Sequence, residues 1–387
     1  MLAVVTSTTE QVRLADYTTL RLGGPASRFI EVGTQEGLVE AVRAADAEPE
    51  PVLVLGGGSN LVVADEGFPG VVVLAACAGL AFAAAGDAVD VRAEAGQDWD
   101  ELVQHCLAAG LSGVECLSGI PGRAGATPIQ NVGAYGQEVA QTITTVRAYD
   151  RLADRIVQLS PADCEFGYRT SMFKRQASAT AGTGRGARGA ALNPAAATGR
   201  FVVVEVTFRL AARPLSSPIR YRELARLLGV PEGGQVPLAD ARAAVLELRR
   251  GKGMVLEETD PDTRSAGSFF TNPVVAADQY TDLTARWSAS VADEAGELTI
   301  PHWPEPDGRV KLSAAWLIER AGFSRGFRLA DDPDGARISG KHTLALTNPG
   351  AARTSSLIRL ARTIRDGVRA RFGVELVNEP TLVGVQL

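Results

Sequence analysis

The chain has 387 residues, of which 45% are hydrophobic and 22% are charged, so it is long enough for two or three domains with ordinary buried cores. Its net charge of −6 and its dispersed basic residues argue against non-specific binding of nucleic acid. The four cysteines form no CxxC pair and the three histidines are scattered, which predicts reduced thiols and no metal site.

The sequence does not contain a segment typical of a membrane helix. The uncharged run 70–86 is rich in Ala and Gly and is shorter than the ~20 residues that a spanning helix needs. The first residues lack the basic region of a signal peptide. We therefore predict a cytoplasmic protein without a membrane span.

Hydrophobic periodicity predicts strands and helices through the first part of the chain. The run 34–45 has apolar residues at helical spacing, and the amphipathic run 98–109 is followed by Gly110. In chain order we predict a polar lead-in at 1–20, a turn and an extended run within 17–30, a helix at 34–45, strands at 51–55, 61–64 and 71–74, a further strand before residue 86, a strand at 89–95 and a helix at 98–109.

Two glycine-rich loops lie in this part of the chain. Residues 56–60 (GGGSN) follow the apolar strand 51–55, and residues 119–136 (GIPGRAGATPIQNVGAYG) contain five glycines. Helices and ordinary strands do not tolerate this much glycine, whereas a backbone that closely approaches a phosphate group does. The longer loop therefore predicts a cradle for a phosphate or a cofactor. Because GGGSN leads into a strand and neither loop reads GxGxxG or GK[ST], a Rossmann fold or a P-loop is disfavoured.

The second part of the chain carries an insertion-like segment and then becomes more helical. Residues 175–200 are rich in Ala, Gly and Arg, which predicts a flexible excursion that limited proteolysis cuts first, rather than a nucleotide clamp built on Arg185 and Arg188. In chain order we predict strands at 142–150, 155–159 and 201–210, helices at 221–228 and 238–250, a turn-rich motif at 265–273, a helix at 311–321, a strand at 343–346, a helix at 355–372, and two extended runs around 378–380.

Five sequence motifs resemble one family, the UDP-N-acetylenolpyruvoylglucosamine reductases of bacterial peptidoglycan synthesis. VLGGGSNLVVAD (54–65) and SGIPGRAGATPIQNVGAYG (118–136) resemble the FAD-contacting loops of that family. FGYRTSMFK (166–174), AGSFFTNP (266–273) and NEP (378–380) resemble its catalytic segments, in the same order. The resemblance covers nearly the whole chain.

This resemblance implies an α+β fold with a two-part flavin-binding domain of the vanillyl-alcohol-oxidase/PCMH type and a smaller α/β substrate-binding domain. The domains then expected are a first FAD subdomain at 1–70, a second at 71–230 that includes the insertion 175–200, a substrate domain at 231–370, and C-terminal strands at 371–387 that return to the FAD domain.

The resemblance also implies the cofactors and the reaction. NADPH reduces FAD, and the reduced flavin passes hydride to the enolpyruvyl double bond of UDP-N-acetylglucosamine enolpyruvate, which gives UDP-N-acetylmuramate. Because no His-Gly pair that suggests covalent attachment precedes the longer loop, we expect FAD to be noncovalent. The FAD-binding residues expected from the two loops are Gly56, Gly57, Gly58, Ser59, Asn60, Gly119, Ile120, Pro121, Gly122, Gly125, Ala126, Thr127, Gln130, Asn131, Gly133, Ala134 and Tyr135.

Three residues suit the chemistry of this reaction. Hydride addition to an enol ether conjugated to a carboxylate develops negative charge on that carboxylate and requires a proton at the adjacent carbon. Arg169 can bind a carboxylate through two N–H donors, and Ser268, beside Gly267, can deliver the proton if its geometry is fixed. Glu379 occupies the position of the family's third catalytic residue, where it would polarise or orient the enolate, or protonate it through water. Without the resemblance, Arg169 would be interpreted as a surface arginine, Ser268 as a serine in a turn, and Glu379 as a solvated glutamate.

Three further residues are expected to bind the substrate: Tyr221, Lys252 and Asn272. The alternative interpretations, without a role in binding, are that Tyr221 packs on a helix face and that Lys252 is a charge at a helix C-terminus. The stretch 253–267 that separates Lys252 from Ser268 is long for the family, which weakens the lysine assignment.

Two other functions compete with this interpretation. An FAD-dependent sugar or alcohol oxidase of the same flavin fold would lack a use for Arg169, Ser268 and Glu379 together. A noncatalytic nucleotide-binding protein would bind no flavin. As partners we expect a small-molecule substrate and no nucleic acid, and we expect the protein to be a monomer.

Overall fold

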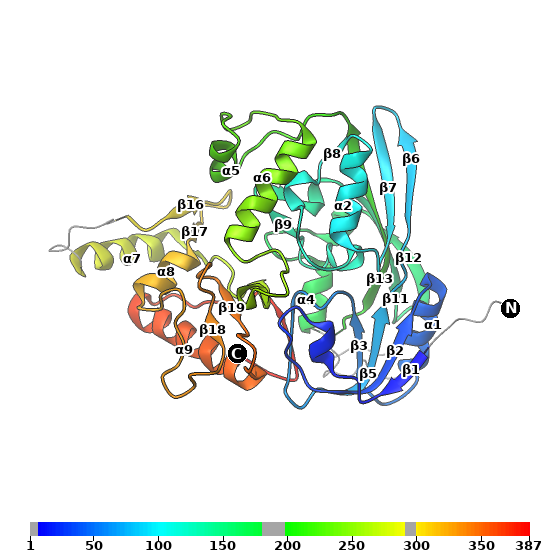
Figure 1. Cartoon of the computed structure of the whole chain (residues 1–387), viewed down its shortest axis with the longest axis horizontal. Helices are drawn as coiled ribbons and strands as arrows, with labels where there is room; N and C mark the ends of the chain where they lie inside the picture. The colour runs from blue at the N-terminus through cyan, green and yellow to red at the C-terminus, as the bar shows by residue number, and fades with distance from the viewer. Residues whose placement is uncertain (1–6, 180–197, 291–298) are drawn as a thin grey trace.

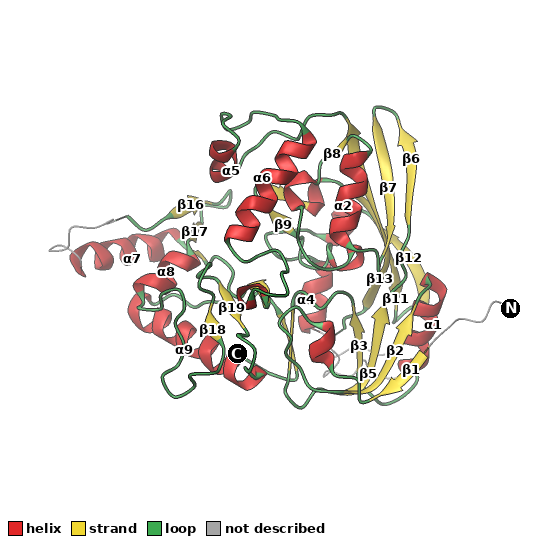
Figure 2. Ribbon diagram, in the orientation of Figure 1, coloured by secondary structure: helices red, strands yellow, loops and turns green. Residues whose placement is uncertain are grey.

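The computed structural model describes residues 7–179, 198–290 and 299–387. Figure 1 shows three neighbouring parts: an N-terminal sheet with one covering helix, a second sheet with helices α2 and α6 beside it, and a C-terminal part built around α7, α8 and α9. Strands and helices alternate through the chain (Figure 2), so the structure is of mixed α and β type, as predicted. Within the described ranges, none of the helices combines the length and the apolar character that crossing a bilayer requires.

The N-terminal sheet has the strand order β1-β2-β5-β3, with β2, β5 and β3 parallel and β1 antiparallel at the edge. Its helix α1 begins after Thr34, whose side chain accepts the N–H of Gly37, and it buries Leu38 and Val42 completely. The bounds are β1 Ser7–Glu10, β2 Ala26–Val32, α1 Gln35–Ala45, β3 Val52–Leu55, β4 Leu61–Val63 and β5 Phe68–Ala75.

The second sheet has the order β12-β11-β13-β7-β6, and β8 pairs separately with β13. Trp99 and Phe208 are buried where α2 packs on this sheet, with ring centroids 5.6 Å apart. The bounds are β6 Leu80–Ala85, β7 Ala88–Glu94, α2 Trp99–Ala108, β8 Leu111–Ser112, β9 Gly133–Ala134, β10 Gln137–Glu138, β11 Ile143–Asp150, β12 Arg155–Leu159, α3 Pro161–Cys164, α4 Met172–Ala179, β13 Phe201–Ala212, α5 Arg222–Leu227 and α6 Leu238–Gly251.

The C-terminal part packs α8 and α9 against two small sheets, with the orders β14-β19-β18 and β15-β17-β16. The chain then returns to the N-terminal part, because β20 pairs in parallel with β4. The bounds are β14 Ser265–Ser268, β15 Val274–Val275, α7 Ala277–Ser290, β16 His302–Pro304, β17 Val310–Leu312, α8 Ala314–Arg320, β18 Arg337–Ile338, β19 Ala345–Thr347, α9 Thr354–Phe372 and β20 Thr381–Val383.

Three local predictions were wrong. The lead-in 1–20 contains strand β1 and buries Leu14 and Leu20, because β1 pairs with the distant strand β2. The predicted helix 311–321 begins only at Ala314, since Lys311 belongs to β17. The motif 265–273 is not only turns, because Ser265–Ser268 form a strand against β19. In each case pairing with another strand decides the backbone conformation.

Most of the predicted insertion lies outside the described residues. Residues 180–197 are not described, and of the predicted excursion 175–200 the residues up to Ala179 continue helix α4. The prediction that proteases cut this segment first therefore stays a prediction, as do the domain boundaries.

Candidate active site

The two glycine loops touch each other backbone to backbone. A Cβ atom on Gly57 would lie 2.7 Å from the Cα of Gly122, and a Cβ on Gly122 would lie 2.7 Å from the Oγ of Ser59. The side chain of Asn60 also donates a hydrogen bond to Gln130, which joins the loops a second time. Glycine is therefore required here because the two backbones approach too closely for a side chain.

The contact leaves backbone donors exposed to a shared cavity. Within the described part of the chain, the N–H groups of Gly57, Gly58 and Ser59 donate to no protein acceptor. Both loops line a cavity of about 120 Å³. Clustered N–H groups without protein acceptors are suited to phosphate oxygens, so the loops fit the diphosphate of a dinucleotide such as FAD.

A larger cavity of about 1220 Å³ continues from this cradle between the two sheets. The two cavities share Val54, Gly56 and Ala126 in their walls, while Val202 and Val203 line only the larger one. Apolar strand residues beside a polar cradle are the surroundings that a dinucleotide needs for its rings and its phosphates.

Arg123 is the charged residue of the longer loop and lies at the mouth of the cradle. It lines the 120 Å³ cavity and also a cavity of about 990 Å³ on the other side of Gly56 and Gly57. Its guanidinium makes no ion pair or side-chain hydrogen bond with any described residue. Arg123 was not among the residues predicted to bind FAD.

The predicted FAD residues do not all face the cradle. Asn131 is buried, and its side chain donates to Glu138 and Gly167 and accepts the N–H of Ala140. Its amide is therefore fully used inside the protein. The predicted residues in the cavity walls are Gly56, Gly57, Gly58, Ser59, Asn60, Ile120, Pro121, Gly122, Gly125, Ala126, Thr127 and Gln130.

Arg169 and Glu379 form an ion pair, with 3.2 Å between Nε and Oε1. Arg169 also donates to the carbonyl oxygen of Gly133 at 2.6 Å, and a Cβ on Gly133 would lie 2.9 Å from its Nη1. The backbone of Arg169 has φ +52°, a left-handed conformation that costs a non-glycine residue free energy. Strain of this kind clusters at functional sites, which favours a functional role for Arg169.

Glu379 is held where three motifs meet. Its N–H donates to the carbonyl oxygen of Phe269 at 2.8 Å, directly after Ser268. Its carbonyl oxygen accepts Nζ of Lys174 at 2.9 Å and, more weakly, Nδ2 of Asn60 at 3.5 Å. Burial raises the pKa of Glu379, and the positive charges of Arg169 and Lys174 oppose this rise.

Ser268 ends strand β14, beside the segment that carries Glu379. Ala345 is its partner across the sheet, Gly267 before it has φ +72°, and a bridge joins Phe270 to Asn378. Among the described residues the Ser268 hydroxyl has no hydrogen-bond partner. A half-buried hydroxyl in this position is available to a ligand.

Tyr221 and Lys252 form a second group with Tyr135. The rings of Tyr135 and Tyr221 meet edge to face at 5.2 Å, and Nζ of Lys252 lies 5.7 Å from the first ring centroid and 6.0 Å from the second. Lys252 also pairs with Glu223 at 2.6 Å. Burial opposes the charge of Lys252, but Glu223 and the two tyrosines raise its pKa overall. Tyr135, predicted to bind FAD, therefore groups with the residues expected to bind substrate.

Asn272 lies on a cavity of about 530 Å³ whose walls also contain Tyr168, Arg169 and Lys174. Its side-chain oxygen accepts the N–H of Ala314 at the start of α8, so part of its hydrogen-bonding capacity is already used. Lys174 lines this cavity and the 1220 Å³ cavity, which places it between the two.

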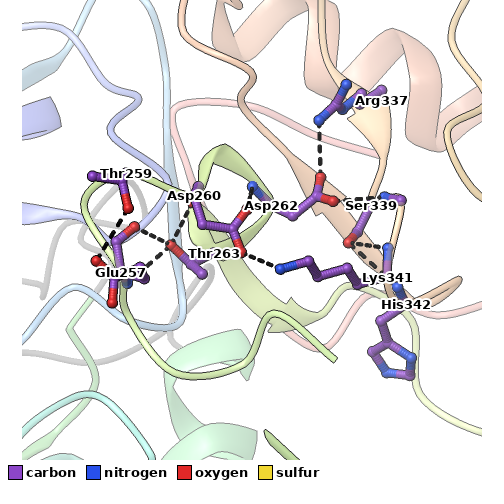
Figure 3. Close-up of polar contacts among 10 residues, drawn as sticks. Glu257, Thr259, Asp260, Asp262, Thr263, Arg337, Ser339, Lys341 and His342 are labelled. Atoms are coloured by element: carbon purple, nitrogen blue, oxygen red, sulfur yellow. Dashed lines mark hydrogen bonds and ion pairs between the residues drawn. The ribbon is translucent and has the colours of Figure 1, made fainter. Parts of the chain in front are cut away.

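The long stretch between Lys252 and Ser268 is fixed to the C-terminal part by acidic residues (Figure 3). Asp260 pairs with Lys341 at 2.5 Å, and Asp262 pairs with Arg337 at 3.0 Å. His342 follows directly, and burial together with Lys252 and Arg325 lowers the pKa of His342 to about 4. These contacts fix the stretch that runs from Lys252 to the Ser268 strand against the C-terminal part.

Sequence reasoning missed Lys174, Tyr168 and His342. Lys174 and Tyr168 lie inside the quoted motif 166–174, so their place beside Arg169 was a usable signal. His342 gave no signal, since its neighbours in space come from distant segments.

Comparisons with known proteins agree with this geometry. Residues 26–157 match the model of an FAD binding domain, and residues 260–383 match that of the UDP-N-acetylenolpyruvoylglucosamine reductase C-terminal domain. The UDP-N-acetylenolpyruvoylglucosamine reductase of Thermobifida fusca is 55% identical over 99% of the chain and 100% of that protein. The one from Salinispora arenicola is 53% identical over 97% of the chain and 96% of that protein.

A solved structure gives the same result. The crystal structure of UDP-N-acetylenolpyruvylglucosamine reductase from Thermus caldophilus is 27% identical, with a TM-score of 0.59, and the match covers 98% of this chain and 99% of that one.

Proposed function

The chain belongs to the UDP-N-acetylenolpyruvoylglucosamine reductase family, and we propose that it reduces the enolpyruvyl group of UDP-N-acetylglucosamine enolpyruvate with electrons from NADPH, giving UDP-N-acetylmuramate. It is accordingly an FAD-dependent oxidoreductase of peptidoglycan precursor synthesis. Its fold class, an FAD-binding domain joined to a smaller C-terminal domain, agrees with the prediction.

The N–H groups of Gly57, Gly58 and Ser59 would hold the diphosphate of FAD, and Arg123 in the wall of the same cavity would add a positive charge. When bound and reduced by NADPH, FAD supplies the hydride to the terminal carbon of the enolpyruvyl double bond. We expect the cavity between the two sheets to enclose the rest of the cofactor.

Arg169 is proposed to bind the carboxylate of the substrate. Its Nε is engaged by Glu379 and its Nη2 by Gly133, but Nη1 makes only a long contact of 3.5 Å to the carbonyl oxygen of Asn131. Donors therefore remain for an incoming carboxylate, and the permanent charge stabilises the negative charge that develops there during hydride addition.

Ser268 is proposed to give the proton to the carbon adjacent to the site of hydride addition. Its hydroxyl has no hydrogen-bond partner among the described residues, and Gly267 leaves the approach open. One hydride and one proton add across the double bond, and the resulting serine alkoxide then regains a proton from solvent.

Glu379 is proposed to share the stabilisation of the enolate. Burial raises its pKa and the charges of Arg169 and Lys174 oppose this rise, and its side chain beside Arg169 is proposed to polarise or orient the enolate. Tyr221, Lys252 and Asn272 are proposed to hold the rest of the substrate. The Tyr221–Lys252 group suits an anionic portion, since its lysine is kept charged.

The observation that carries this proposal is the Arg169–Glu379 pair, because it joins the motif 166–174 to the backbone beside Ser268 and lies next to the cofactor cavity. The test is a visible spectrum of the purified protein, taken as isolated, after anaerobic NADPH and after the enolpyruvyl substrate. Bleaching by NADPH and return of colour only with the substrate is the expected result. Recovery in air after reduction by another donor would indicate an oxidase, and a protein that binds no FAD would refute a flavoenzyme.

A further inference from the structure

Lys174 contacts the backbone that carries Glu379. Its Nζ donates to the carbonyl oxygen of Glu379 at 2.9 Å. Lys174 lies in the first turn of α4, and the Ser171 hydroxyl at the start of that helix donates to the carbonyl oxygen of Ile129 at 2.5 Å. This hydrogen bond fixes the helix to the longer glycine loop, and it therefore also fixes the position of Lys174 relative to Glu379.

The second link to Glu379 comes from the opposite side. Its N–H donates to Phe269, so the peptide groups on both sides of the side chain are bound, one by the strand after Ser268 and the other by Lys174. Asn60 adds only a contact of 3.5 Å to the same carbonyl oxygen. Lys174 is therefore the stronger of the two side-chain donors that fix this carbonyl group.

Lys174 also adds a positive charge close to the Arg169–Glu379 ion pair. It lines both of the cavities that meet here. A positive charge in this position favours the approach of an acidic substrate.

We propose that Lys174 is a positioning residue for the reduction, which holds Glu379 through its backbone carbonyl group and adds a positive charge that favours an anionic substrate beside Arg169. This inference rests on the proposed function and extends it to a residue outside the catalytic trio.

The charged groups around Glu379 agree with this role. Arg169 and Lys174 both lower its pKa against the effect of burial, and the pKa of the neighbouring Tyr168 is raised by burial and, in smaller part, by Glu379. Burial lowers the pKa of Lys174, while Glu379 opposes that change. Removing the lysine charge should therefore raise the pKa of Glu379.

The experiment compares Lys174→Met and Lys174→Arg with Arg175→Met in the FAD-loaded enzyme. Arg175 is a matched control, because it is the next cation of the same helix and pairs with the exposed Glu165 instead. Stopped-flow absorbance follows reduction by NADPH and then reoxidation by the enolpyruvyl substrate over a range of pH. In a plot of the reoxidation rate against pH, the limb that disappears in Glu379→Gln is the one that reports the titration of Glu379.

We expect Lys174→Met to slow reoxidation by about tenfold to 100-fold, as displacement of a catalytic group does, and to move the Glu379 limb to higher pH. Lys174→Arg should restore the limb, and Arg175→Met should behave as the wild-type protein. Wild-type reoxidation and an unmoved limb in Lys174→Met would overturn the proposal. Equal slowing in both lysine variants without any shift of the limb would reduce Lys174 to a purely structural residue and would also overturn it.

A measurement without turnover separates this proposal from the proposed function. In protein labelled with ¹³C at the glutamate carboxyl carbons, the resonance lost in Glu379→Gln should titrate at higher pH in Lys174→Met than in the wild-type protein. The same titration in both proteins would refute the role of Lys174. Failure of the wild-type enzyme to be reoxidised by the substrate would instead refute the proposed function.

Discussion

The carboxylate of Glu379 lies 3.2 Å from the guanidinium of Arg169, although one residue comes from the middle of the chain and the other from its end. The return of β20 to β4 makes this contact possible, because it brings the segment before Thr381 alongside the GGGSN loop. The pair is thus a product of the fold as a whole, and its geometry should respond to changes in either element.

Ser268→Ala should separate the two halves of the reaction. Reduction of FAD by NADPH should remain close to the wild-type rate, because it does not need the serine proton. Reoxidation by the enolpyruvyl substrate should fall by about 100-fold to 10,000-fold, the usual contribution of a positioned proton donor. Stopped-flow absorbance measures both steps, and Ser324→Ala, at an exposed position, is the control. Wild-type reoxidation in Ser268→Ala would assign the proton to another group.

Gly57→Ala should disrupt the cofactor cradle. The added Cβ would lie 2.7 Å from the Cα of Gly122, and because the obstacle is backbone rather than a flexible side chain, the two loops must move apart. We expect a loss of about 1–3 kcal/mol in the free energy of unfolding and weaker FAD binding, measured by denaturant titration and by flavin fluorescence. Gly33→Ala is the control, since no atom lies within 4 Å of its added Cβ. Equal effects of both changes would contradict the loop contact.

Arg123→Gln should weaken FAD binding in a way that depends on salt. A guanidinium beside the diphosphate adds a charge-assisted contact, so we expect about a tenfold rise in the FAD dissociation constant at low ionic strength. The difference should shrink as salt screens the charge. Titration of the apoprotein with FAD at two salt concentrations measures this, with exposed Arg213→Gln as the control. A dissociation constant unchanged at low salt would place the diphosphate away from Arg123.

Local sequence patterns were sufficient to predict those helices and strands whose signals lie within their own residues. Helix α1 was predicted because its apolar spacing is a local signal, and the strand 51–55 because an apolar run leads into glycines. Strands β1 and β17 were missed because each depends on a partner elsewhere in the chain. Lys311 in particular continues into a helical pattern in the sequence, but the pairing of β17 with β15 and β16 overrides it.

The site could be predicted in outline but not in its contacts. The resemblance to a family predicts Arg169, Ser268 and Glu379 as catalytic residues, which stays a prediction, and the structure brings their segments together. The resemblance did not indicate Lys174. The partner of that lysine is a backbone carbonyl group, which every residue type has, so the residue at the partner position gives no sign of the contact. Tyr135 was predicted to bind FAD because it lies in the glycine-rich motif. Its backbone is left-handed, with φ +49°, and its ring packs on Tyr221.

His342 should make the protein less stable as the pH falls below neutrality. In the folded protein burial and nearby cations lower its pKa to about 4, whereas in the unfolded chain it takes up a proton near pH 6.5. Between these values the unfolded state binds more protons, so the free energy of unfolding decreases as the pH falls through this window. Above pH 6.5 the side chain is neutral in both states and has no such effect.

Replacement of His342 isolates this contribution from that of the many carboxylates. The loss of stability between pH 7 and pH 5, measured by denaturant titration, should be smaller in His342→Gln than in the wild-type protein, because glutamine takes up no proton. His105→Gln, at an exposed position on α2, is the control variant. Parallel losses in the wild-type protein and His342→Gln would mean that the imidazole near Lys252 can be protonated in the folded state, and that this side of the site is open to water.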